Sequence, residues 1–494
     1  MDRVINRRDV LFVAVTFAIG IFVGALIADN TILKIILPIA LFAVGIIFAI
    51  PCKKFWIGCL YFAMCLGIVA MTIDFAVSSA EHIEGRYDIE ARVVSVDGSY
   101  CIAEDISIDG KGVKGKATFH TDNLKIGDLV SFNANVDTLN MDIFDTYSTS
   151  AFNDRVYYRF TAIENMTVVS GDLKFLERVR KRITAPMFKY MAEEDAGIAM
   201  SLFFGDKSRL NEVDAELIKG VGMSHVFAVS GLHVGFLTAL IIFVMKKLRQ
   251  SPKRIFVLTA LALLAYGFLT GFSSGIKRAA IMGLIYLAAP LIKRKSDPVT
   301  ALSAASIVIL LTNPRELFDV GFIMSVSAVL GIILFQKPVC KLLCLNGKVQ
   351  NKIYKYFADG LALTVSANIF LLPICFNVFN SFAVYMALSN LVILPLVTVS
   401  YVMVALAAIC TAVFPFLGFL YFPSKYPIIV IRLIAELIYS FPLAVISVPA
   451  LGAATACYVA GGLFVSRLNK LNYKIKLIVL AVLLLIGALL LLLV

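Results

Sequence analysis

The stretch Val10-Leu-Phe-Val-Ala-Val-Thr-Phe-Ala-Ile-Gly-Ile-Phe-Val-Gly-Ala-Leu-Ile-Ala28 contains no charged residue. A membrane core of about 30 Å requires roughly 20 apolar residues in a helix, so this stretch is long enough to cross one. It lacks a small-x-small cleavage site, which favours a retained anchor over a removed signal peptide. The whole chain is similar, since 60% of its 494 residues are apolar and only 16% are charged. Soluble domains average roughly 45–50% apolar and about 25% charged, so an ordinary soluble fold is excluded.

Similar apolar stretches recur along the chain. They occupy residues 31–50, 55–77, 225–245, 255–271, 277–292, 298–312, 320–335, 357–376, 382–412, 443–465 and 475–494. The stretch 382–412 contains Pro395 and is too long for one simple span. Because each span needs roughly 20 apolar residues, the pattern predicts about eight to eleven spans, together with amphipathic or re-entrant helices. The predicted fold class is a mostly α-helical, polytopic membrane protein with an inserted small β-domain.

Lys and Arg gather in six clusters, at residues 3–8, 53–54, 246–254, 293–295, 337–355 and 467–476. Cytoplasmic loops are enriched in both residues. We therefore predict that these clusters and the N-terminus lie in the cytoplasm and that the protein is in the plasma (inner) membrane. Residues 412–443 leave the number of crossings open. Arg432 and Glu436 fit either an interfacial amphipathic helix or a buried ion pair, and the flanking Pro427 and Pro442 favour the interfacial helix.

Residues 78–170 differ from the rest in composition. Segments such as Tyr87–Val96 and Asp128–Val136 alternate apolar and polar residues, which predicts a small antiparallel barrel or sandwich. Residues 78–170 contain eight Lys and Arg and fifteen Asp and Glu, so this domain is acidic. The alternation of cytoplasmic and external loops along the chain places it outside the cytoplasm. It contains only Cys101, so no disulfide is expected within it. The run 110–117 has Ala where a phosphate loop needs Ser or Thr, which indicates a turn between strands and no ATPase.

Residues 173–191 predict an amphipathic helix. The apolar face contains Leu176, Val179, Ile183 and Met187, and the other faces carry Arg178, Lys181 and Arg182. We favour a helix that lies on the outer leaflet of the membrane. The alternative is a basic face that binds a polyanion.

The run Gly220-Val-Gly-Met-Ser-His225-Val-Phe-Ala-Val-Ser230-Gly-Leu-His233-Val-Gly235 places ionisable residues in an apolar stretch, where they are costly and are functional candidates. On a straight helix roughly 12 Å separates His225 from His233, so they share neither a metal ion nor a proton relay. Ser230 and His233 share a face, as a serine–histidine dyad requires. We favour structural packing, in which Ser230 and Gly231 permit close helix approach. The sequence predicts no catalytic residue, metal site or cofactor.

Basic and polar residues also occur where a simple membrane helix does not need them. Lys277 and Arg278 follow a glycine-rich turn at the predicted noncytoplasmic end of a span, which indicates a local requirement for positive charge. A charged turn contains Gly205, Asp206, Lys207 and Arg209. Polar and helix-breaking residues lie deeper in the apolar stretches, at Asn368, Pro373, Asn390 and Pro395. Such backbone persists only where it lines a cavity or is buried in protein.

Together these residues form motifs that resemble the ComEC family of competence proteins, the inner channel for DNA in bacterial natural transformation. The motifs are Gly205-Asp206-Lys207, His225-x4-Ser230-Gly231-Leu-His233-x-Gly235, Gly275-Ile-Lys277-Arg278-Ala279-x2-Met282, Asn313-Pro314 with Phe322-Ile-Met-Ser325-x-Ser327-Ala-Val329, and Ser389-Asn390-Leu-Val-Ile-Leu-Pro395. They occur in the family's order over residues 196 to about 410.

The resemblance implies further features. Family members have two or three spans followed by an external domain that resembles an OB-fold, and such folds often bind single strands in a basic groove, whereas this domain is acidic. Long members end in a metallo-β-lactamase-like domain, whose histidine cluster is missing here. The resemblance thus implies a short form that is not an enzyme. The resemblance implies an outer DNA receptor and a cytoplasmic ATPase or helicase as partners. Single-stranded DNA and membrane lipids are also expected, and the presence of a separate nuclease is left open.

The predicted organisation has four parts: N-terminal transmembrane helices at 1–77, an external OB-like domain at 78–170, an amphipathic interfacial segment at 171–219 and a competence-type channel domain at 220–494. The predicted function is import of single-stranded DNA into the cytoplasm, with weak phosphate contacts at Lys207, Arg209, Lys277 and Arg278. Two alternatives remain. They are an intramembrane serine hydrolase that uses Ser230 and His233, and a small-molecule or ion transporter that uses the broken helices.

Overall fold

The computed structural model describes residues 9–27, 31–49, 55–77, 82–97, 100–121, 124, 127–139, 155–169, 175–227, 231–272, 274–292, 297–342, 352–448, 452, 455, 458 and 459. The chain divides into two compact units. Unit 1 contains residues 183–302 and 323–494 together with residues 1–8, and unit 2 contains residues 9–182 and 303–322.

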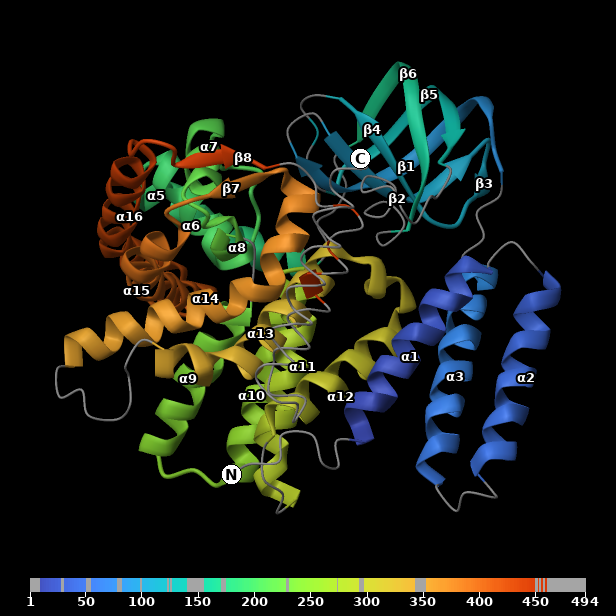
Figure 1. Ribbon diagram of the computed structural model, residues 1–494. Coiled ribbons are helices and arrows are strands. Elements are labelled where there is room, and N and C mark those ends of the chain that lie inside the picture. Colours follow the sequence, from blue (N-terminus) through green and yellow to red (C-terminus); the bar gives the residue numbers. More distant parts are fainter. Residues whose placement is uncertain are drawn as a thin grey trace. The chain divides into compact units, whose positions relative to one another are not determined.

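Unit 2 begins with three apolar helices that pack side by side, α1 (Asp9–Leu26), α2 (Thr31–Ala49) and α3 (Phe55–Val77) (Figure 1). Helices α1 and α3 approach each other through glycines. A Cβ atom on Gly20 would lie 2.1 Å from the carbonyl oxygen of Met64, and one on Gly67 would lie 2.3 Å from that of Phe17. Small residues allow such close backbone approach between membrane helices, so a larger side chain at either glycine would separate the pair.

The β-domain of unit 2 is a closed barrel. Its strands are β1 (Gly85–Asp97), β2 (Tyr100–Ile108), β3 (Lys111–Gly112), β4 (Lys116–His120), β5 (Leu129–Thr138) and β6 (Val156–Val169). Antiparallel pairs join β1 with β2 and β5, β2 with β4, and β5 with β6, while a parallel pair joins β4 with β6. These five strands therefore close on themselves in the manner of an OB-fold barrel. The predicted OB-like domain is confirmed, apart from the parallel pair.

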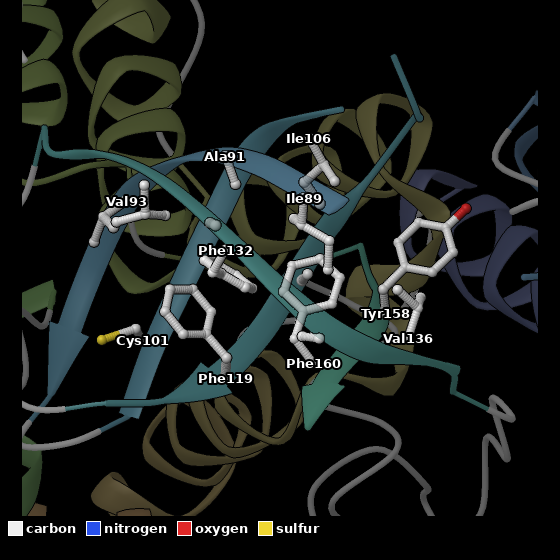
Figure 2. Packing of buried hydrophobic residues seen from close by; sticks show 14 of the residues in the cluster. Ile89, Ala91, Val93, Cys101, Ile106, Phe119, Phe132, Val136, Tyr158 and Phe160 are labelled. Carbon is white, nitrogen blue, oxygen red and sulfur yellow. The ribbon is translucent and has the colours of Figure 1, made fainter. Parts of the chain in front are cut away.

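Aromatic rings fill the centre of this barrel (Figure 2). The ring centroids of Phe119, Phe132 and Phe160 lie 5.4–6.2 Å from one another. Cys101 is fully buried in the same core. Gly110 has a φ of +77° in the turn between β2 and β3, a conformation that glycine adopts without steric penalty. The run 110–117 thus contains a turn between strands, as predicted, together with the short strand β3 and the first residues of β4.

The other elements are mostly helical. In chain order they are α5 (Phe175–Tyr190), α6 (Glu193–Phe204), α7 (Glu212–Gly220), α8 (Ser224–Phe227), α9 (Gly231–Lys247), α10 (Pro252–Leu269), α11 (Ser274–Ala288), η1 (Ala289–Ile292), α12 (Pro298–Thr312), η2 (Pro314–Phe318), α13 (Val320–Leu342), α14 (Lys352–Phe379), β7 (Ser381–Ala383), α15 (Met386–Val413), η3 (Pro415–Ser424), α16 (Lys425–Tyr439) and β8 (Val445–Ser447). Local sequence explains where some begin. The Ser251 side chain accepts a hydrogen bond from the Arg254 N–H at the start of α10, where Pro252 has no N–H to leave unpaired.

Among the described residues, six helices are long and apolar enough to cross a membrane: Gly58–Ala76, Pro252–Leu269, Val320–Lys341, Tyr354–Phe379, Met386–Val413 and Pro415–Tyr439. Shorter apolar helices occupy Val10–Leu26, Ile32–Gly45 and Pro298–Thr312. The predicted fold class, a polytopic helical membrane protein with an inserted β-domain, is therefore confirmed.

Two details of the predicted spans differ from the structure. The stretch that looked too long for one span contains the single helix α15, with Pro395 inside it. Within the predicted span 225–245 the structure describes α8 and α9, and residues 228–230 between them lie outside the described residues. The predicted span 443–465 begins with strand β8, which pairs with β7 and keeps these residues out of a helix. The predicted span 475–494 lies outside the described residues.

Candidate functional site

Two predicted motifs, at residues 231–235 and 275–279, lie next to each other in unit 1. Helices α9, α10 and α11 pack as neighbours and are joined by short loops, so α9 and α11 both begin at the same end of the group (Figure 1). The helices approach closely there, since a Cβ atom on Gly231 would lie 3.4 Å from the Cβ atom of Ala279. The N-termini of two helices therefore meet at these motifs.

Lys277 and Arg278 lie in the first turns of α11, beside these N-termini. Arg278 is buried, with 7% of its surface exposed, and Lys277 is half-buried. A helix N-terminus carries positive partial charge, so a cation there is disfavoured by about 0.3–1 kcal/mol. Two cations beside helix N-termini create a positive electrostatic potential, which favours binding of an anion such as a phosphate. We call Lys277, Arg278 and the N-termini of α9 and α11 the basic site.

An aromatic cluster connects helices α6, α9, α10 and α15. His233 is fully buried, and its ring centroid lies 4.9 Å from that of Tyr401. The Tyr401 ring lies 5.9 Å from the Phe203 ring, and the Tyr266 hydroxyl donates a 2.8 Å hydrogen bond to the Phe203 carbonyl oxygen. His233 thus lies in packed protein interior. Sequence reasoning missed Phe203, Tyr266 and Tyr401, because an aromatic residue in an apolar stretch gives no separate signal.

His225 precedes α9, the helix that carries His233. It belongs to α8, its side chain is exposed, and its Nδ1 atom lies 3.2 Å from the Gly222 carbonyl oxygen. Residues 228–230, between His225 and His233, lie outside the described residues, so the separation estimated along one straight helix stays a prediction. Ser230 lies outside the described residues, so a Ser230–His233 dyad stays a hypothesis. No group of three His, Cys, Asp or Glu side chains among the described residues is placed to hold a metal ion.

The charged turn at residues 205–209 follows α6 directly. Gly205 ends the helix with a φ of +71°, and the Asp206 carboxylate accepts a hydrogen bond from a backbone N–H two residues later. Lys207 and Arg209 are exposed at this turn. Phe203 lies just before this turn, and its ring contacts Tyr401, which also contacts His233. The aromatic cluster therefore links the turn to α9, the helix that carries His233.

The polar residues predicted at membrane depth have two environments. Asn368 lines a cavity of about 240 Å³, together with residues of β7, the start of α15, and Tyr458. Asn390 does not line this cavity. Its Oδ1 atom is buried with no hydrogen-bond partner among the described residues, and Pro395 lies further along the same helix. The expectation that such residues line cavities or are buried in protein fits both asparagines.

Arg432 in α16 is partly buried and forms an ion-pair cluster within unit 1 with two buried carboxylates and one exposed carboxylate. Its guanidinium nitrogens lie 2.9 Å from the Glu194 carboxylate, 3.1 Å from that of Asp214 and 3.6 Å from that of Asp195. Burial raises the pKa of Asp195 and of Asp214, and the Arg432 charge opposes this rise. No contact among the described residues places α16 relative to a membrane, so the interfacial helix stays a prediction. An ion pair is formed, but its partners lie in α6 and α7, and Glu436 is exposed.

Arg432→Ala should lower the free energy of unfolding by about 3 kcal/mol or more, because it leaves two buried carboxylates without their counter-charge. Thermal or denaturant unfolding of the detergent-solubilised chain at neutral pH measures this. Glu436→Ala, one turn away and exposed, is the matched control and should unfold like the native chain.

Acidification should reduce the loss of unfolding free energy that Arg432→Ala causes. Asp195 and Asp214 have raised pKa values in the folded state, so their protonated forms favour folding. That contribution is complete below the unfolded pKa of about 4 and is lost as the pH rises through the folded pKa. The difference in unfolding free energy between the Arg432→Ala variant and the native chain should therefore become smaller as the pH falls from 7 to about 5. A gap that is constant with pH would contradict this account of the cluster.

Unit 2 contains a buried ion pair that sequence reasoning missed. Arg315 in η2 is 1% exposed, and its Nε atom lies 2.5 Å from the carboxylate of Asp74 in α3. Arg155, just before β6, also reaches Asp74 at 3.3 Å. The available signal was that Asp74 is the only charged residue in the apolar stretch 55–77. An isolated charge in such a stretch predicts a partner elsewhere in the chain.

The residues of the basic site and the aromatic cluster lie within a region shared with known proteins. A family model described as "Competence protein" matches residues 202–471, which is more than half of the chain. The chain belongs to the ComEC family of competence proteins. The β-domain and the N-terminal helices precede the matched region. Lys207, His233, Lys277, Arg278 and Asn390 all lie inside it.

One curated relative of this competence protein is "ComE operon protein 3" of Bacillus subtilis (strain 168). The two are 27% identical over 241 residues, which cover 49% of this chain and 30% of the relative. The matched part therefore spans less than a third of the relative's length. No solved structure matches the chain.

Proposed function

We propose that this competence protein forms a channel that imports single-stranded DNA into the cytoplasm during natural transformation. Membership of the competence family supports a part in DNA uptake. The observation that carries the channel proposal is the basic site, where two helix N-termini, Lys277 and the buried Arg278 concentrate positive charge within an apolar bundle. Phosphate groups are the anions that DNA would bring to it.

Transport requires contacts that form and break easily. Lys207 and Arg209 are exposed and would meet the strand first, while Lys277 and Arg278 would hold phosphates within the bundle. Each contact is a weak charge interaction, and conduction depends on several such sites rather than on one tight one. We assign the chain no enzymatic step, so the energy for movement would come from a cytoplasmic ATPase or helicase. An outer receptor would deliver the DNA, and a separate nuclease would supply the single strand.

The proposed direction of transport fixes an orientation. The basic clusters and the N-terminus would lie in the cytoplasm, because charge bias in short loops sets topology. The acidic β-domain and the turn 205–209 would then lie outside, where incoming DNA arrives.

This orientation is tested with single cysteines at Ser208 and Ser251, both of which are exposed. On intact spheroplasts, a membrane-impermeant thiol reagent should label Ser208→Cys above the background of the native chain. Ser251→Cys should be labelled only after lysis, since it lies within the basic cluster 246–254, which is predicted to be cytoplasmic. Labelling of Ser251→Cys without lysis would reverse the orientation and contradict import in the proposed direction.

A further inference from the structure

Helix α5 carries a basic face that the proposed basic site does not use. Residues 178–190 contain five Lys and Arg and no acidic residue. Arg178, Lys181, Arg182 and Lys189 are all exposed. Their separations of three, four and seven residues place them on one side of the helix. This set of four residues is the α5 basic face.

The opposite side of α5 is covered by the protein itself. Ile183 is 3% exposed and Met187 is fully buried. The hydroxyl of Tyr421 in η3 donates a 3.2 Å hydrogen bond to the Ile183 carbonyl oxygen, and a Cβ atom on Gly418 would lie 2.8 Å from the Cβ of Pro186. Helix η3 therefore occupies the apolar side over these turns.

This packing disagrees with the favoured sequence interpretation, in which α5 lies with its apolar side on the outer leaflet. An interfacial helix binds a membrane through the apolar area that it buries among lipids. In α5 that area, at Ile183 and Met187, is buried in protein. What α5 presents outward is positive charge, so an anionic polymer fits it better than a lipid surface.

We propose that the α5 basic face binds the sugar–phosphate backbone of single-stranded DNA, an inference that rests on the proposed function. From Arg178 to Lys189 the helix rises roughly 16 Å, at 1.5 Å per residue, which is long enough to follow several consecutive phosphates. Two of the four side chains are arginines, whose planar donors pair with phosphate oxygens. Contacts of this kind are independent of base sequence, as a transport substrate of any sequence requires.

The test measures binding of a fluorescent single-stranded oligonucleotide to the full chain in nanodiscs of neutral phosphatidylcholine, by anisotropy over a series of salt concentrations. The variant combines Arg178→Gln, Lys181→Gln, Arg182→Gln and Lys189→Gln. Each phosphate contact to a single strand contributes about 0.7 to the slope of log K against log salt. The variant slope should therefore be shallower by roughly 2 to 3, with weaker binding at low salt.

Two matched variants control for charge and folding. Lys246→Gln, Lys247→Gln, Lys253→Gln and Arg254→Gln remove the same charge from exposed positions at the end of α9 and the start of α10 and should leave the slope unchanged. Arg178→Lys with Arg182→Lys keeps the charge of α5 and should also keep the slope. Loss of slope in the Gln variant alone supports the inference, because a general loss of charge or of folding would not produce this pattern.

A slope that is the same in the α5 Gln variant and the native chain overturns the inference. The inference is also overturned if the Gln variant keeps the salt dependence of DNA binding but no longer associates with anionic phosphatidylglycerol nanodiscs. The α5 basic face would then bind lipid rather than DNA. Either result leaves the proposed function standing if DNA uptake by cells still requires the chain. Loss of that requirement would instead remove the proposed function itself.

Discussion

Replacing Lys277 and Arg278 together with glutamine should lower the amount of DNase-resistant DNA inside competent cells at least about tenfold. The amount of protein in the membrane should not change. The buried Arg278 and half-buried Lys277 supply the fixed charge of the basic site, and glutamine keeps polarity while removing that charge. A charge-assisted hydrogen bond contributes about 1.5–3 kcal/mol, so losing it at two positions reduces strand retention by an order of magnitude or more.

Two comparisons make this prediction specific. Lys246→Gln with Lys247→Gln removes the same charge from exposed positions at the far end of α9 and should leave uptake unchanged. Lys277→Arg with Arg278→Lys exchanges the two cations and should retain most uptake, since the charge is kept. If the double glutamine variant is as abundant in the membrane as the native chain and takes up as much DNA, the basic site is not part of the DNA path.

Arg315→Ala should destabilise unit 2 by about 3–5 kcal/mol, because it leaves the Asp74 carboxylate buried without its main counter-charge. Arg155 is half-exposed and contacts Asp74 at the longer distance of 3.3 Å, so it compensates only in part. The measurement is the unfolding midpoint of the solubilised chain, followed by limited proteolysis of the β-domain.

A double-mutant cycle separates this ion pair from simple loss of packing. Asp74→Asn with Arg315→Ala should be more stable than Arg315→Ala alone, because the unpaired charge has been removed. Lys111→Ala, at an exposed position in β3, should unfold like the native chain. Equal stability of Arg315→Ala and the native chain would show that Asp74 does not depend on Arg315.

Much of the fold follows from local patterns. Apolar length predicted the helices, and alternation predicted the β-domain, because both patterns reflect which side of an element is buried. The parallel pairing of β4 with β6 was not predictable in this way, since it depends on how the chain closes the barrel. Likewise, nothing in the composition of residues 443–465 signals that Val445–Ser447 form strand β8, which pairs with β7.

The candidate site likewise contains residues that a local sequence signal predicts and residues whose positions depend on packing between distant segments. Lys277 and Arg278 were predicted from charge in an apolar context, which is a local signal. Their position beside Gly231 arises from the packing of α9 on α11, and Tyr401 reaches His233 from a helix far along the chain. The partner of Asp74 lies 241 residues away, so a lone charge signals that a partner exists but not which residue it is.

The central claim is that this chain carries DNA across the membrane. The most direct test deletes the gene in the source organism and follows fluorescent DNA under conditions of competence. The account predicts that DNA still binds to the cell surface and remains sensitive to added DNase, while no labelled strand becomes DNase-resistant until the native chain is restored. Normal accumulation of DNase-resistant, internal DNA in the deletion strain would contradict the account.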